Sequence, residues 1–169
     1  MLKTLRKIGS IGLVSEAAPP PDESLRVGPA LDAAIAAALG RALCIRHVDA
    51  GSCNGCELEI QALGNPYYNL EGHNIRFVAS PRHADLLLVT GPVVKNMEAA
   101  LKRVYAATPS PKRVVAVGEC GCSGGILGEC PASLGRVSKV IPVDVAVPGC
   151  PPSPVRILQG ILTAMAPAG

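Results

Sequence analysis

The sequence is poor in aromatic residues, in long apolar runs and in net charge. It contains no Trp, one Phe and three Tyr, so few rings are available for stacking on nucleic-acid bases. The net charge of +3 is mild and forms no basic stripe, and together these absences argue against a nucleic-acid partner. No apolar run reaches the length of a membrane span. Any contact with a membrane is therefore expected to be peripheral or to pass through a partner.

The first residues also lack the sustained apolar stretch of a secretory signal, which leads us to expect an intracellular protein. Apolar residues nevertheless make up 49% of the chain, and most of them are Ala, Val, Leu and Ile. Aliphatic cores of this kind are typical of parallel sheets covered by helices. A chain of 169 residues favours one domain, which we place at residues 29–169.

The hydrophobic pattern alternates between short β-like runs and longer helical stripes. The predicted strands cover residues 45–50, 75–79, 84–90, 113–118 and 143–147, and the predicted helices cover 28–43, 54–63, 95–107 and 151–165. Strands that alternate with helices over short connections predict a parallel sheet with right-handed crossovers. The fold class is therefore α/β.

Residues 1–28 are predicted to form an extended N-terminal arm outside this domain. Leu2, Leu5 and Ile8 stand at helical spacing with lysines between them. One interpretation is a short amphipathic segment that lies on a membrane surface or on a partner. The other is a solvated terminus without a specific contact. Pro19–Pro21 predict a stiff, extended linker between the arm and the domain.

Seven cysteines in a chain of this kind indicate metal or redox chemistry before disulfides. Cys53 and Cys56 form a CxxC pair after the first predicted strand, Cys120 follows the fourth strand and Cys150 follows the fifth. The carboxyl ends of parallel strands meet at one edge of a sheet, where ligands bind. Four thiolates at that edge make a site for one soft metal centre, which is either zinc or an iron–sulfur cluster.

The spacing of the cysteines favours the iron–sulfur cluster over zinc. A zinc ribbon requires a second CxxC about 15–20 residues after the first, whereas the next cysteine after Cys56 is Cys120. A zinc-stabilised binding module without a redox role remains the alternative from another class. Cys120 is preferred to Cys122 as the ligand because it stands two residues past the predicted strand, at the carboxyl edge with Cys53 and Cys150. Cys122, like Cys44 and Cys130, is expected to be a bystander.

Glu57 is the ionisable residue next to the CxxC pair. A carboxylate beside a buried redox centre is a candidate proton relay. The alternative is an ordinary first-turn carboxylate, which the helix dipole favours. His47, His73 and His83 are scattered along the chain and form no recognisable triad or metal motif.

Four segments together resemble one protein family, the small subunit of group 4 membrane-bound, energy-converting [NiFe] hydrogenases of the formate hydrogenlyase type. These segments are Asp49–Glu57, Ser80–Asp85, Gly118–Cys120 with Gly124-Gly125, and Val143–Pro152. This family is homologous to the cluster-bearing 20-kDa subunit of respiratory complex I. The complex I subunit has adjacent cysteines where this chain has Cys53-x-x-Cys56, which favours the hydrogenase branch. A cluster-bearing subunit of a complex I-like NADH/quinone oxidoreductase remains the alternative.

The resemblance implies a flavodoxin-like, three-layer fold that carries one [4Fe–4S] cluster. It also implies an electron-transfer role next to a [NiFe]-bearing large subunit, with a ferredoxin-like iron–sulfur subunit and membrane-arm subunits as further partners. We accordingly expect an oxidoreductase subunit that is not catalytic in isolation. Its expected location is the cytoplasmic face of the cell membrane, where the complex holds it peripherally.

Overall fold

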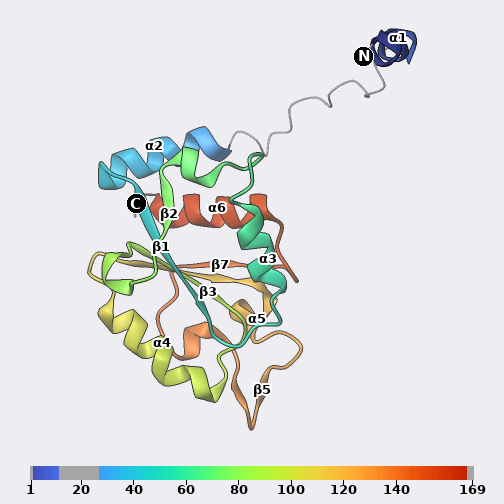
Figure 1. The fold of residues 1–169 in the computed structure, drawn as a ribbon. Coiled ribbons are helices and arrows are strands. Elements are labelled where there is room, and N and C mark those ends of the chain that lie inside the picture. Colours follow the sequence, from blue (N-terminus) through green and yellow to red (C-terminus); the bar gives the residue numbers. More distant parts are fainter. Residues whose placement is uncertain (1, 12–26, 167–169) are drawn as a thin grey trace.

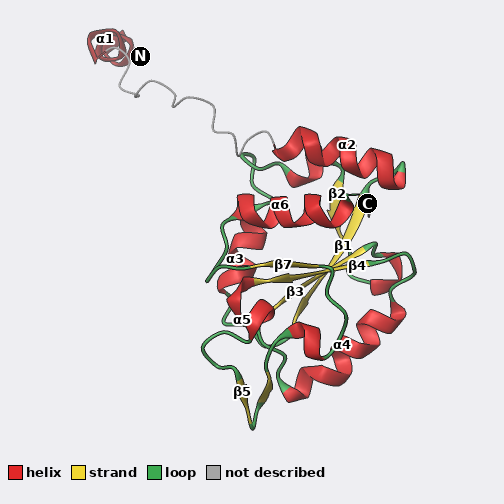
Figure 2. Ribbon diagram, turned by 180° about the vertical axis from the view of Figure 1, so that it is seen from behind, coloured by secondary structure: helices red, strands yellow, loops and turns green. Residues whose placement is uncertain are grey.

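The computed structural model describes residues 2–11 and 27–166. A central sheet separates two layers of helices (Figure 1). Helices α2 (Val27–Leu39) and α6 (Pro154–Met165) lie on one face, and helix α4 (Lys95–Ala107) lies on the other. Figure 2 shows the same three layers from behind. The predicted three-layer α/β architecture is thus confirmed.

Five strands form the central sheet, and every neighbouring pair is parallel. They are β1 (Leu43–Asp49), β2 (Ile75–Phe77), β3 (Leu86–Thr90), β4 (Arg113–Val117) and β7 (Val145–Val147). Their spatial order is β2-β1-β3-β4-β7. This is the flavodoxin-like doubly wound order, in which the chain starts in the sheet interior and adds strands on either side.

The central strands are buried on both faces, so their side chains alternate between two cores. Leu86 and Leu88 of β3 face α2 and α6, whereas Leu87 and Val89 face α4. All five residues of β3 are buried. A continuous apolar run is what a strand needs when helices cover both sides of it.

The chain between residues 39 and 43 corrects the predicted boundary between the first domain helix and the first strand. Helix α2 ends at Leu39, and Gly40 adopts a left-handed φ of 62° while its N–H donates to the carbonyl of Ala36. Glycine favours this conformation because it has no Cβ. Leu43 continues the helical spacing in the sequence, yet it is the first residue of β1. Both kinds of element can use a buried leucine, so periodicity alone places it wrongly in the helix.

Helix α3 (Gly55–Ala62) matches the prediction within one residue at each end, but the final helix begins at Pro154 rather than at 151.

Several short elements were not expected from the sequence. Cys120 lies in a short helix, α5 (Gly118–Ser123), rather than on a simple turn. Strands β5 (Glu129–Cys130) and β6 (Ser133–Leu134) form a small antiparallel hairpin. The remaining short elements are the 3-10 helices η2 (Leu70–His73), η3 (Pro81–His83) and η4 (Val137–Lys139).

The N-terminal segment contains a helix, α1 (Leu2–Ile11). The predicted linker Pro19–Pro21 lies outside the described residues, and α2 begins at Val27. Among the helices in the described part of the chain, none combines the length and the apolar character that crossing a bilayer requires.

Candidate metal centre

The carboxyl ends of four strands lie side by side at one edge of the sheet. The register pairs Asp49 of β1 with Thr90 of β3, Thr90 with Val117 of β4, and Val117 with Val147 of β7. The four strands therefore end in line. Helices α3 and α5, which follow β1 and β4, lie at this same end of the sheet in both views (Figures 1 and 2).

The CxxC pair sits on a turn that the Asp49 side chain orders. One oxygen of its carboxylate accepts hydrogen bonds from the N–H groups of Gly51, at 2.8 Å, and Ser52, at 2.7 Å. Asn54 then adopts a left-handed φ of 72° at the N-cap position of α3, and its carbonyl accepts a hydrogen bond from the N–H of Leu58. This geometry leaves Cys53 exposed on the turn and brings Cys56, which is half-buried, into the first turn of the helix.

Cys120 and Cys150 come from two further strand ends that are joined directly. The N–H of Glu119, the residue before Cys120, donates to the carbonyl of Gly149, the residue before Cys150, at 2.7 Å. Cys120 is half-buried in α5, while Cys150 is exposed. The hydrogen bond fixes the position of α5 relative to the Cys150 turn.

Two glycines leave space for the cysteine sulfurs. A Cβ on Gly118 would lie 2.5 Å from Sγ of Cys56, and a Cβ on Gly125 would lie 2.7 Å from Sγ of Cys120. Both distances are below any normal van der Waals contact. Both glycines also have positive φ, at 84° and 59°, which disfavours other residues. The chain is thus locally shaped around its thiols.

The four thiols lie close enough to affect one another electrostatically. Burial, above all, raises the pKa of Cys56 to about 12, and the charges of Glu57, Cys120, Cys53 and Cys150 add to the effect. Burial also raises the pKa of Cys120, with further contributions from Cys150 and Cys53. Burial thus disfavours the charged thiolate form, and a bound metal cation offsets this effect because it stabilises thiolates. The four cysteines that the sequence selected therefore lie at one edge of the sheet, within electrostatic reach of one another.

This donor set fits an iron–sulfur cluster by its chemistry and by its glycine-lined space. Within residues 2–11 and 27–166, no three His, Cys, Asp or Glu side chains converge in the way that a single metal ion requires. A [4Fe–4S] cluster makes a different demand, since its four thiolates each bind a different iron. Cys53, Cys56, Cys120 and Cys150 would be those ligands.

Cys122 and Cys44 make their contacts away from the edge cysteines. Sγ of Cys122 donates to the carbonyl of Ala116 at 3.6 Å, and the side chain packs against the core on the α4 side. Burial raises the pKa of Cys122 to about 11, and none of the four edge cysteines contributes to this shift. The N–H of Cys44 donates to Asp85 at 3.0 Å in the first half of β1, away from the carboxyl edge.

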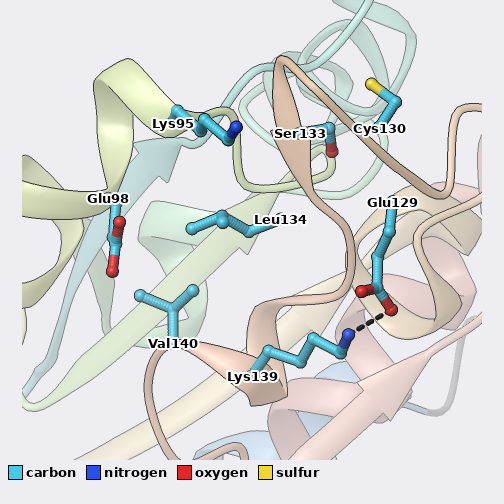
Figure 3. A pocket seen from close by; sticks show the side chains of 8 residues that line it. All are labelled: Lys95, Glu98, Glu129, Cys130, Ser133, Leu134, Lys139 and Val140. Atoms are coloured by element: carbon cyan, nitrogen blue, oxygen red, sulfur yellow. Dashed lines mark ion pairs between the residues drawn. The ribbon is translucent and has the colours of Figure 1, made fainter.

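Cys130 lies on the hairpin, beside a cleft of about 520 Å³. Figure 3 shows this cleft, which is lined by Lys95, Glu98, Glu129, Cys130, Ser133, Leu134, Lys139 and Val140, with an ion pair between Glu129 and Lys139. The two acidic residues of the lining are accompanied by two lysines. These lining residues form no donor set that resembles the carboxyl edge.

Glu57 is buried, with 8% of its surface exposed, and it belongs to a polar group that spans three elements. The hydroxyl of Thr90 donates to Oε1 of Glu57, and Nε2 of His47 lies 3.0 Å from the same hydroxyl oxygen. Because the Thr90 proton is given to Glu57, the His47 nitrogen is the donor in the second contact. Oε2 of Glu57 is buried and has no hydrogen-bond partner among the described residues.

The sequence did not reveal His47 and Thr90 as members of this group. His47 stands apart from the other histidines, and Thr90 is predicted only as part of a buried strand. One signal was present, since Thr90 is a polar residue that ends the apolar run Leu86–Val89. That Thr90 lies beside His47 depends on the register between β1 and β3, which cannot be read from the sequence.

By its architecture, the molecule belongs to the class of flavodoxin-like α/β proteins whose ligand-binding edge is lined by cysteines. Residues 53–164 match the family model of the NADH ubiquinone oxidoreductase 20-kDa subunit. The chain belongs to this family. The resemblance inferred from the motifs is thereby confirmed, and so is the expectation of an oxidoreductase family.

Relatives with assigned names include a membrane-bound hydrogenase subunit and a formate hydrogenlyase subunit. The chain is 47% identical over 127 residues to the probable membrane-bound hydrogenase subunit mbhJ of Pyrococcus furiosus, covering 75% of this chain and 76% of that protein. It is 40% identical over 144 residues to formate hydrogenlyase subunit 7 of Escherichia coli, covering 85% of this chain but only 55% of that protein. A solved structure of the membrane-bound sulfane sulfur reductase, an archaeal respiratory membrane complex, contains a similar chain. That chain matches with a TM-score of 0.65 and 32% identity, covering 85% of this chain and 75% of its own length.

Proposed function

We propose that this chain is the electron-transfer subunit of a membrane-associated [NiFe] hydrogenase complex. It would carry one [4Fe–4S] cluster on Cys53, Cys56, Cys120 and Cys150. The observation that supports this most directly is the position of these four cysteines at the in-line carboxyl ends of the strands. The hydrogenase branch is favoured by the CxxC pair and by the identity with mbhJ and with formate hydrogenlyase subunit 7.

The cluster, when bound, supplies one-electron redox chemistry, and the chain's own residues set its surroundings. Burial of Cys56 and Cys120 restricts water on the side of the sheet, which is one of the factors that tune a cluster's potential. Cys53 and Cys150, in contrast, are exposed. Electrons would therefore pass through the exposed side, where a partner protein can approach.

Exposed apolar side chains stand close in sequence to residues of the site and are proposed to contact the large subunit. Leu58 stands two residues after Cys56 and is 58% exposed. Ile126 is 100% exposed and Leu127 is 58% exposed, and both follow Gly125, which packs against Cys120. Large apolar side chains in the open are typical of protein interfaces. A ferredoxin-like subunit and membrane-arm subunits would complete the complex on the cytoplasmic face of the membrane.

Glu57 is proposed as a proton relay beside this centre. Its carboxylate is not simply a solvated first-turn group, because Thr90 and His47 connect it to the wall of a cleft of about 840 Å³. Glu57→Gln keeps the shape and the hydrogen bond from Thr90 but removes the exchangeable carboxyl proton. The relay predicts full cluster content in this variant together with slower hydrogen turnover by the assembled complex. Unchanged turnover would leave only the structural role.

A complex I-like quinone-reducing assembly is the second candidate, and the family match favours it. Nickel separates the two. The chain, affinity-tagged and purified from its own host without dissociating its partners, is expected to bring down a nickel-containing large subunit together with iron. The isolated, cluster-loaded chain is expected to oxidise no hydrogen. A complex that contains iron but no nickel would contradict the hydrogenase assignment and favour the second candidate.

A further inference from the structure

Helix α1 carries positive charge only. Its sequence, LKTLRKIGSI, contains Lys3, Arg6 and Lys7 and no acidic residue. All three basic residues are exposed, and so is Leu2, at 84%. The strands of the sheet and the cysteines of the proposed redox centre come from other parts of the chain.

In the helical repeat of α1, the basic and the apolar positions occupy two different arcs. At about 100° per residue, the positions of Lys3, Arg6 and Lys7 lie within about 100° of one another and form one stripe. The positions of Leu2, Leu5 and Ile8 fill the neighbouring arc on the other side. A helix with a basic face and an apolar face is the pattern that lies in the plane of a membrane surface.

The length of α1 also fits a helix that lies on a membrane surface. At 1.5 Å per residue its ten residues extend about 15 Å, which is half the thickness of the apolar layer of a bilayer. A helix this short is also marginal in water without a surface to bind. Burial of the apolar side in a membrane interface would stabilise it, while the basic stripe faces lipid headgroups.

We propose that α1 anchors the chain directly to the anionic surface of a lipid bilayer. Charge complementarity favours an anionic lipid surface as the binding partner of α1. Each Lys or Arg near an anionic surface strengthens binding about fivefold, so the three together strengthen it about 100-fold. In the proposed function, other subunits hold the chain to the membrane. The anchor adds a direct contact between the chain and the lipid. It also does not depend on the metal centre.

Flotation of the full-length, cluster-loaded chain with lipid vesicles tests the anchor. The chain is expected to float with vesicles that contain equal parts of phosphatidylcholine and phosphatidylglycerol, to stay behind with pure phosphatidylcholine, and to be released as salt is raised. The double variant Lys3→Glu/Lys7→Glu should bind the anionic vesicles at least tenfold more weakly. Leu5→Glu/Ile8→Glu should lose binding as well, although it leaves the basic stripe intact.

Two controls isolate α1 from the rest of the surface. Arg103→Glu/Arg156→Glu makes the same change in net charge at exposed positions of α4 and α6 and should float like the parent chain. Leu58→Ser/Ile126→Ser removes exposed apolar groups at the redox edge and should float as well. Equal loss in either control, or parent chain that stays behind with anionic vesicles, would overturn the proposal. Cluster absorption near 400 nm, recorded on every sample, shows whether the cluster is present. A failure to float can therefore be distinguished from a failure of the proposed redox function.

Discussion

The hydroxyl of Thr90, the last residue of β3, donates a hydrogen bond to the buried carboxylate of Glu57 in the first turn of α3. The contact joins the centre of the sheet to the helix that carries Cys56. It gives the buried carboxylate of Glu57 a hydrogen-bond donor. The carboxyl edge is therefore ordered by polar contacts behind the cysteines as well as by the turns that carry them.

Thr90→Val should destabilise the protein without removing the cluster. The substitution keeps the shape of the side chain but leaves the Glu57 oxygen without its donor, which costs about 1–3 kcal/mol in a buried position. Urea denaturation of the cluster-loaded protein under anaerobic conditions measures this loss. Thr163→Val is the matched control, because the Thr163 hydroxyl is exposed and bonds only to its own helix. Equal losses of stability in the two variants would show that the hydrogen bond to Glu57 contributes no more than that of an exposed hydroxyl.

Cys120→Ala should lose the cluster, whereas Cys122→Ala should keep it. Cys120 lies with the other edge cysteines, while Cys122 bonds to Ala116 on the α4 side of the sheet. Iron content and absorption near 400 nm report the outcome. The reverse pattern would move the ligand assignment to Cys122. Loss in both variants would mean that the integrity of the α5 loop, rather than one thiolate, determines cluster binding.

Gly118→Ala should lower cluster content sharply. The added methyl group would lie 2.5 Å from Sγ of Cys56 and displace it from the other thiols. Gly128→Ala provides the control, since Gly128 also has a positive φ, 51°, but has open space around it. Both variants carry the strain of a left-handed alanine, about 1 kcal/mol. Only Gly118→Ala is expected to reduce the iron bound per chain, and full iron content in that variant would contradict the assigned position of Cys56.

The stability of the cluster-free protein should fall as pH rises above 9. Cys56 has an ordinary thiol pKa of 9.0 when the chain is unfolded, and the fold raises this pKa to about 12. Between these values the unfolded chain releases a proton that the folded protein retains, so rising pH favours unfolding. Urea midpoints measured from pH 8 to 10.5 should decline less steeply for Cys56→Ser than for the parent chain. Cys130→Ser, which changes an exposed cysteine on the hairpin, should retain the parent slope.

Long, regular features of the fold were predictable from the sequence. The continuous apolar run of β3, flanked by glycine and proline turns, specified a strand buried on both faces. The position of each cysteine after a strand then specified the edge at which they meet. Both inferences depend on local pattern and on a general property of parallel sheets.

Features that depend on tertiary contacts were not predictable in the same way. Helix α5 and the β5–β6 hairpin are too short to show a period, and the hairpin is held by backbone bonds from Lys95 to Ala132 and from Leu134 to Val93. The link between His47, Thr90 and Glu57 requires the register of two strands that are far apart in sequence. Leu43 satisfied the helical and the strand pattern equally, and only the left-handed Gly40 decided between them.

The most direct test of the account is a determination of metal and sulfide on the anaerobically purified chain. A [4Fe–4S] cluster on Cys53, Cys56, Cys120 and Cys150 predicts about four iron atoms and about four acid-labile sulfides per chain. It also predicts a brown protein whose absorption near 400 nm bleaches on reduction. A colourless protein that contains zinc and no labile sulfide would contradict the account.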